Sequence, residues 1–203
     1  APNFCMLLRK YIGSGRILKV SQPGLERIIE FEIEHLDELG DLCHKRLIVE
    51  LMGKHSNIIF CKEDGTIIDS IKHVSAQISS VREVLPGRTY FIPNTTDKAD
   101  PFTVSLETFQ KLIGQSPTPI QKALYQKLTG VSPMMGTELC YLASIDGDHS
   151  ANELSEAELL HLHHTLCLMM EEVTEGRFTP NIVYRQEEPV EFASLPLTCL
   201  EGN

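Results

Sequence analysis

The fold is decided by residues 22–31, which read QPGLERIIEF, and by residues 50–59, which read ELMGKHSNII. Along the continuation of the first stretch the residues alternate between apolar and charged, in the order Ile29, Glu30, Phe31, Glu32, Ile33 and Glu34. A period of two is typical of a β-strand, because successive side chains point to opposite faces. The two stretches therefore predict neighbouring strands, and the glutamates predict a solvated sheet face rather than paired acid–base carboxylates.

The strand pattern continues on both sides of these stretches. Alternation recurs at residues 47–52, and Asp64-Gly65 marks a tight hairpin between apolar runs at 57–61 and 66–71, because that pair favours a positive φ. The pattern predicts four short strands in an antiparallel meander. Residues 6–11 predict a short helix before the meander, and residues 77–93 predict an irregular connection.

From residue 105 onward the spacing of apolar residues becomes helical. It predicts helices over 105–113, 118–128, 134–145 and 155–174. Each of the first two ends at a glycine and a short polar link, as a helix-hairpin-helix requires. In nucleic-acid-binding examples such a link, here Gly130 to Ser132, holds a phosphate. A plain helical bundle with well-capped ends explains the same pattern, and both interpretations stay open.

Two strand-like stretches, 180–184 and 190–197, follow the helices, and we expect them to return to a sheet. The fold class is therefore α+β, with an antiparallel β-meander domain, a helical domain and returning C-terminal strands. The expected divisions are residues 1–98, 99–178 and 179–203.

Composition restricts the class of protein. Of 203 residues, 42% are apolar, which suffices for one or two buried cores, and no apolar run approaches the roughly 20 residues that cross a bilayer. The six cysteines include no Cys-x-x-Cys pair, so we expect reduced thiols and a cytoplasmic protein; disulfides are the alternative. No membrane association is expected.

The formal charge of −10 argues against a nucleic-acid partner, but its distribution weakens that argument. Through Arg88, twelve basic residues offset twelve acidic ones, so the whole deficit belongs to the second half. No acidic residue precedes Glu26, whereas four basic residues do. These four offer a cationic face for a nucleic-acid backbone, with an ordinary solvated surface as the alternative: Arg9, Lys10, Arg16 and Lys19.

No catalytic motif is complete. Gly53-Lys54 lacks the leading glycine of a phosphate-binding loop, and the turn at residues 13–16 lacks the third glycine of a dinucleotide fingerprint. His163 and Cys167, four apart on one helical face, are the best metal candidates, but no further ligand is evident. We therefore expect a non-catalytic protein without a cofactor or metal.

Several motifs in one order resemble the N-terminal region of the NFACT family. They are residues 3–10 (NFCMLLRK), 22–31, 50–59, 67–72 and 85–87, followed by 130–133 and 191–193. Family members continue into a coiled coil and a further domain and have an additional segment before residue 3. The resemblance therefore implies that this chain is an internal fragment.

The resemblance implies a cytosolic factor that binds a stalled large ribosomal subunit, recruits alanyl-tRNA and directs C-terminal alanine tailing. An Asp-Arg pair contributes to tRNA recognition in the family, and Glu26-Arg27 occupies that place. Glutamate keeps the negative charge of aspartate, but its side chain is longer by one methylene. Arg27 offers a planar fork for a phosphate or base edge, and an ion pair with Glu26 or a strand carboxylate is the structural alternative.

Two other hypotheses come with the resemblance. One is a surface adhesin that binds fibronectin, which an older family name suggests; the chain shows no export signal or anchor. The other is a DNA-binding or repair-like module, because the family domain is similar to the fold of Fpg-type glycosylases. The catalytic N-terminus of those enzymes has no counterpart in this sequence.

Overall fold

The computed structural model describes residues 2–94 and 97–201. The chain divides into two compact units, Ala1–Thr95 and Thr96–Asn203, each with its own hydrophobic core. The first unit contains an antiparallel sheet and the second contains helices and a hairpin, so the expected α+β class is confirmed. No helix within the described ranges has the length and apolar character needed to span a membrane.

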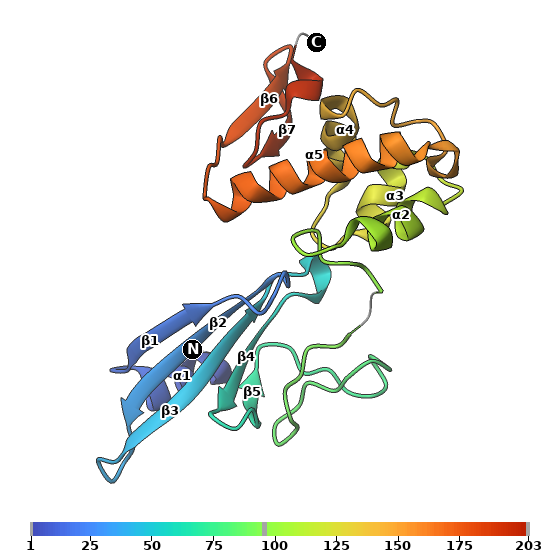
Figure 1. The fold of residues 1–203 in the computed structure, drawn as a ribbon. Coiled ribbons are helices and arrows are strands. Elements are labelled where there is room, and N and C mark those ends of the chain that lie inside the picture. The colour runs from blue at the N-terminus through green and yellow to red at the C-terminus, as the bar shows by residue number, and fades with distance from the viewer. Residues whose placement is uncertain (1, 95–96, 202–203) are drawn as a thin grey trace. The chain divides into compact units, whose positions relative to one another are not determined.

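The first unit is a five-stranded meander with the order β1-β2-β3-β4-β5, and every neighbouring pair is antiparallel. Figure 1 shows the strands side by side as one twisted sheet. The helices and strands of this unit are α1 (Asn3–Ile12), β1 (Arg16–Ser21), β2 (Ile28–Leu36), β3 (Leu42–Glu50), the 3₁₀ turn η1 (Gly53–His55), β4 (Asn57–Lys62) and β5 (Ile67–Ser70).

The four predicted strands correspond to β2 to β5, and the predicted hairpin glycine, Gly65, has a φ of 87°. Strand β1 was not predicted. It is an edge strand, nearly all of its residues are exposed, and a register shift between Ile17 and Lys19 breaks its alternation. Strand prediction depends on the alternation that a buried face imposes, and β1 shows no such alternation.

Both faces of the sheet are covered. Tyr11 of α1 packs against Phe60 of β4, with ring centroids 6.1 Å apart. The opposite face of the sheet forms the core. Val84 and Tyr90, from the irregular segment 71–94, pack against this face. The strand residues of this core are Ile28, Ile48, Ile59, Cys61 and Ile67.

The predicted solvated face of glutamates is wrong in part, because these residues share the core face of β2. The side chain of Glu30 is only 14% exposed and accepts two hydrogen bonds from the guanidinium of Arg46, at 2.5 and 3.0 Å. That hydrogen bonding raises the pKa of Arg46. Alternation identifies side chains that share a face, but it does not show which face the rest of the chain covers.

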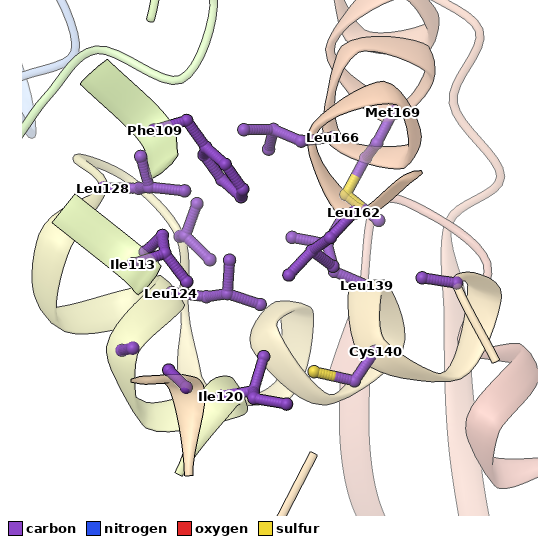
Figure 2. Close-up of a cluster of buried hydrophobic side chains, with 14 of the residues drawn as sticks. Phe109, Ile113, Ile120, Leu124, Leu128, Leu139, Cys140, Leu162, Leu166 and Met169 are labelled. Carbon is purple, nitrogen blue, oxygen red and sulfur yellow. The ribbon is translucent and has the colours of Figure 1, made fainter. Parts of the chain in front are cut away.

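The second unit packs its helices around one core (Figure 2), in which Phe109, Ile113, Leu124 and Leu162 are fully buried. Its elements are α2 (Leu106–Gly114), α3 (Ile120–Lys127), α4 (Pro133–Leu142), η2 (Ala151–Glu153), α5 (Glu156–Thr174), β6 (Asn181–Arg185), β7 (Glu188–Ala193) and η3 (Thr198–Leu200).

The four predicted helices are present, and local sequence fixes their starts. The hydroxyl of Ser105 accepts a hydrogen bond from the amide of Thr108, and Ser155 forms a capping box with Glu158. The third helix ends at Leu142 rather than near residue 145, because Ser144 adopts a φ of 55°.

The returning strands are not confirmed as a return to the larger sheet. Strands β6 and β7 pair with each other in a separate two-stranded sheet, and Asn181 bonds to the carbonyl of Leu195 at 2.8 Å. Leu195 belongs to the helical core, so the hairpin is anchored to the second unit.

The six cysteines are free thiols with different exposure, which predicts an order of alkylation. Cys167 is exposed, whereas Cys61 and Cys140 are buried, and burial raises the pKa of Cys61 to about 11 and that of Cys140 to about 12. We expect N-ethylmaleimide to modify Cys167 at least roughly 100-fold faster than either buried thiol, as mass spectrometry of timed digests would show. All six should react in denaturant; equal native rates would contradict the packing described here.

Candidate nucleic-acid interface

The loop of residues 22–27 joins β1 to β2 and carries Glu26 and Arg27. Gly24 adopts a φ of 53°, and the Gln22 side-chain amide donates to the carbonyl of Glu26 at 2.7 Å. The amide of Leu51, just after β3, donates to the carbonyl of Arg27 at 2.8 Å. These bonds hold the backbone of the loop while both side chains remain exposed.

Arg27 forms no ion pair with a carboxylate in the described part of the chain. The structural alternative considered above, an ion pair with Glu26 or a strand carboxylate, is therefore not observed. An exposed guanidinium on a held backbone presents five donors in a rigid fork, a geometry suited to phosphate oxygens or to a base edge.

The four N-terminal basic residues differ from Arg27. Lys10 pairs with Glu38 at 3.3 Å, Arg16 with Glu34 at 2.8 Å and Lys19 with Glu32 at 3.7 Å. Arg9, on α1, contacts only the sulfur of Met6 at 4.0 Å among the described hydrogen-bond partners. Three of the four charges are thus locally compensated, which reduces the cationic face that the sequence predicts.

A buried ionic cluster lies beside the loop. Glu50, at the end of β3, is 1% exposed and accepts hydrogen bonds from Arg82 and, at 2.9 Å, from the hydroxyl of Tyr90. Arg82 also donates to the carbonyl of Phe91 at 2.7 Å. The cluster connects segment 71–94 to strand β3, and the residue after β3, Leu51, holds the backbone of Arg27. Sequence patterns could not predict the cluster, because its members lie up to 40 residues apart.

Ser56 and Asn57, at the start of β4, have structural roles. The Ser56 hydroxyl accepts from the amide of Met52 at 2.9 Å. The Asn57 side chain, 7% exposed, accepts from the amide of Lys72 at 3.0 Å and donates to its carbonyl at 2.9 Å. The polar side-chain atoms of Ser56 and Asn57 are thus used in hydrogen bonds within the protein.

Gly130 and Ser132 lie in the second unit, in the link between α3 and α4. Gly130 has a φ of 75°, and Ser132 caps α4 by accepting from the amide of Met135 at 3.1 Å, with Pro133 in the first turn. The positive φ of Gly130 and the proline in the first turn of α4 agree with the sequence, but a helix-hairpin-helix is not confirmed. The same bonds make a well-capped helix, so phosphate binding at this link remains a prediction.

His163 and Cys167 of α5 lie close together, but His163 contacts the core and Cys167 is exposed. His163 contacts the backbone carbonyl of Val104 through Nε2 at 2.9 Å and packs on the ring of Phe109 at 5.2 Å. The sulfur of Cys167 lies 3.9 Å from the imidazole nitrogens. No group of three candidate metal ligands occurs among residues 2–94 and 97–201.

Comparison with known proteins identifies relatives over the whole chain. A family model described as the NFACT N-terminal and middle domains matches residues 1–203. The Rqc2 homolog RqcH of Bacillus subtilis (strain 168) is 37% identical over 202 residues, which cover 99% of this chain and 33% of that protein. The Rqc2 homolog RqcH of Streptococcus suis is 43% identical over 148 residues, or 71% of this chain and 26% of that protein.

Solved structures with the same fold include the fibrinogen binding protein from Staphylococcus aureus, with a TM-score of 0.81 and 28% identity over 100% of this chain and 70% of that chain. The N-terminal part of the fibronectin/fibrinogen-binding protein from Streptococcus suis has a TM-score of 0.66 and 32% identity, covering 96% of this chain and 66% of that chain. The chain spans a third or less of the length of the two curated relatives above. With a family model matched from end to end, this chain belongs to the NFACT family.

Proposed function

We propose that this chain is the part of a ribosome-associated quality-control factor that recognises tRNA on a stalled large ribosomal subunit. The complete cytosolic factor would recruit alanyl-tRNA and direct alanine tailing, while the ribosome makes the peptide bonds. The chain itself is then a non-catalytic RNA-binding module. Membership of the NFACT family and similarity to proteins named RqcH support this proposal.

The observation that carries the proposal is the state of Arg27. It stands on a loop that is hydrogen-bonded to β3, its side chain is exposed, and no described carboxylate neutralises it. A guanidinium presented this way gains two charge-assisted hydrogen bonds on meeting a phosphate or a base edge, and no internal ion pair has to break first.

Glu26 is the neighbouring group in the proposed site. Its carboxylate is exposed, and its backbone carbonyl accepts from Gln22. In this proposal Glu26 accepts a hydrogen bond from the exocyclic amine or the ribose of tRNA. The longer side chain reaches one methylene farther than the aspartate to which it corresponds in the family, which alters selectivity among tRNA species more than overall affinity.

We expect Arg27→Ala to weaken tRNA binding at least about tenfold, because one bidentate contact contributes about 1–3 kcal/mol. The measurement is fluorescence anisotropy of labelled tRNA across a salt series. Arg88→Ala is the matched control, since it removes one exposed guanidinium that is already paired with Glu83. Equal losses in both variants would mean that only net charge matters and would contradict a specific role for Arg27.

Fibronectin binding is the second candidate function, because structural neighbours carry fibronectin- or fibrinogen-binding names. The test measures binding of the wild type, Arg27→Ala and the control variant to immobilised fibronectin. Saturable capture that is unchanged in Arg27→Ala would place an adhesive surface away from the tRNA site.

Duplex DNA in the anisotropy assay tests the repair-like alternative, which predicts tighter binding of DNA than of tRNA.

A further inference from the structure

Three loops meet at one end of the sheet, because alternate connections of an antiparallel meander lie on the same side. They are residues 22–27 before β2, residues 51–56 between β3 and β4, and residues 71–73 after β5. Besides Arg27 they carry two exposed lysines, Lys54 and Lys72. We call Arg27, Lys54 and Lys72 the basic corner.

Hydrogen bonds hold the backbone of Lys72 and connect the two lysine loops. Asn57 binds both the amide and the carbonyl of Lys72, and the Ser70 hydroxyl donates to the same carbonyl at 2.8 Å. The Lys72 ammonium donates to the carbonyl of Lys54 at 3.1 Å, which uses one of its three protons. The positive side chains of Lys54 and Lys72, 18 residues apart in sequence, therefore lie on one surface that hydrogen bonds hold in place.

The charges of the basic corner are not compensated within the described structure. Neither lysine forms an ion pair with a described carboxylate, whereas Lys10, Arg16 and Lys19 each do. The carboxylate of Asp69 pairs with His73 at 2.6 Å, and Glu50 is enclosed by Arg82 and Tyr90. Glu26 is the exposed acidic residue of these loops.

The basic corner extends across several strands of the sheet. Arg27 precedes β2 and Lys72 follows β5, three strand spacings away, so the charges extend across roughly 14 Å of the sheet end. Lysine binds phosphate as a mobile point charge, while arginine adds directional hydrogen bonds. Lysine contacts with phosphate position a nucleic acid, and the directional contacts of arginine can select it.

We propose that Lys54 and Lys72 bind the sugar-phosphate backbone of the RNA that Arg27 recognises, so that the basic corner is one continuous RNA-binding surface. This inference rests on the proposed function of Arg27. It assigns to Lys54 and Lys72 the sequence-independent part of the affinity, and to Arg27 the part that depends on the identity of the RNA.

The test compares Lys54→Gln/Lys72→Gln with Arg88→Gln/Lys111→Gln, two double variants that remove the same formal charge; Arg88 and Lys111 are exposed and already paired with Glu83 and Glu107. Wild type, both doubles and Arg27→Ala are titrated with labelled tRNA and with a labelled oligouridylate between about 50 and 200 mM salt. We expect the lysine double to bind either RNA about tenfold more weakly at ~0.1 M salt, and the slope of log affinity against log salt to fall by about 1.5. The control double should retain most of its affinity. Circular dichroism establishes that each variant is folded.

The outcomes separate this inference from the proposed function. If the lysine double matches the control double while Arg27→Ala loses tRNA, the basic corner is overturned and the role of Arg27 stands. If the lysine double loses both RNAs while Arg27→Ala binds tRNA normally, backbone binding by Lys54 and Lys72 is supported, and both tRNA recognition by Arg27 and its place in the basic corner are overturned. A folded wild type that binds neither RNA overturns both.

Discussion

Replacing Arg82 by methionine is expected to lower the free energy of unfolding of the sheet unit by about 3–5 kcal/mol, one of the two largest effects we predict. The reason is the position of Glu50, which is 1% exposed and keeps only the Tyr90 hydroxyl as a side-chain partner once the guanidinium is removed. A buried carboxylate without its counter-ion has lost its hydration, and a single hydrogen bond from Tyr90 offsets only part of that cost. The carbonyl of Phe91 also loses its donor.

Chemical denaturation monitored by hydrogen exchange measures this loss and assigns it to residues 1–95. Arg88→Met is the matched control, because Arg88 pairs with Glu83 at 2.9 Å but is 61% exposed, and exposed pairs contribute about 1 kcal/mol or less. Adding Glu50→Gln to Arg82→Met should recover most of the loss, since no charge is then buried. A single Arg82 variant as mild as the control would show that the cluster is open to water.

Truncating Phe109 to alanine is expected to destabilise the helical unit by about 3–5 kcal/mol. Phe109 is fully buried in the core shown in Figure 2, and its ring packs against the imidazole of His163 at a centroid distance of 5.2 Å. Removing the ring loses apolar burial and leaves a cavity among helices that relax only in part.

Phe178→Ala is the control for Phe109→Ala, because it deletes the same atoms from a side chain that is 50% exposed. Each unit has its own core, so hydrogen exchange should show faster opening of amides in 96–203 and little change in 1–95. Equal effects of the two phenylalanine substitutions, or loss of protection in the sheet unit as well, would contradict two separate cores.

Local chemistry explains why much of the fold could be predicted. A hairpin glycine, helical spacing and period-two alternation act within a few residues, so Gly65, the helices beginning near residues 105 and 155, and strand β2 were predicted from sequence. Strand β1 could not be found in this way. Its residues are exposed, and it is a strand because β2 provides the hydrogen-bonding partners.

The candidate site divides in the same way. The family motif singles out Glu26 and Arg27 in the sequence, but whether Arg27 is paired depends on the positions of all neighbouring carboxylates. The same dependence explains why Arg16 and Lys19, equally basic in sequence, are compensated by Glu34 and Glu32 of the adjacent strand.

The α+β class, the helices, the central strands and the family could be predicted from the sequence, because each depends on short-range patterns or on ordered motifs. Three features became evident in the folded protein alone: the glutamate face of β2 is partly buried, Glu50 meets Arg82 across 32 residues, and Lys54 and Lys72 share one corner. These features escaped prediction because burial and charge compensation depend on distances in space. Strand pairing and the packing of segment 71–94 set those distances, and no local pattern records them.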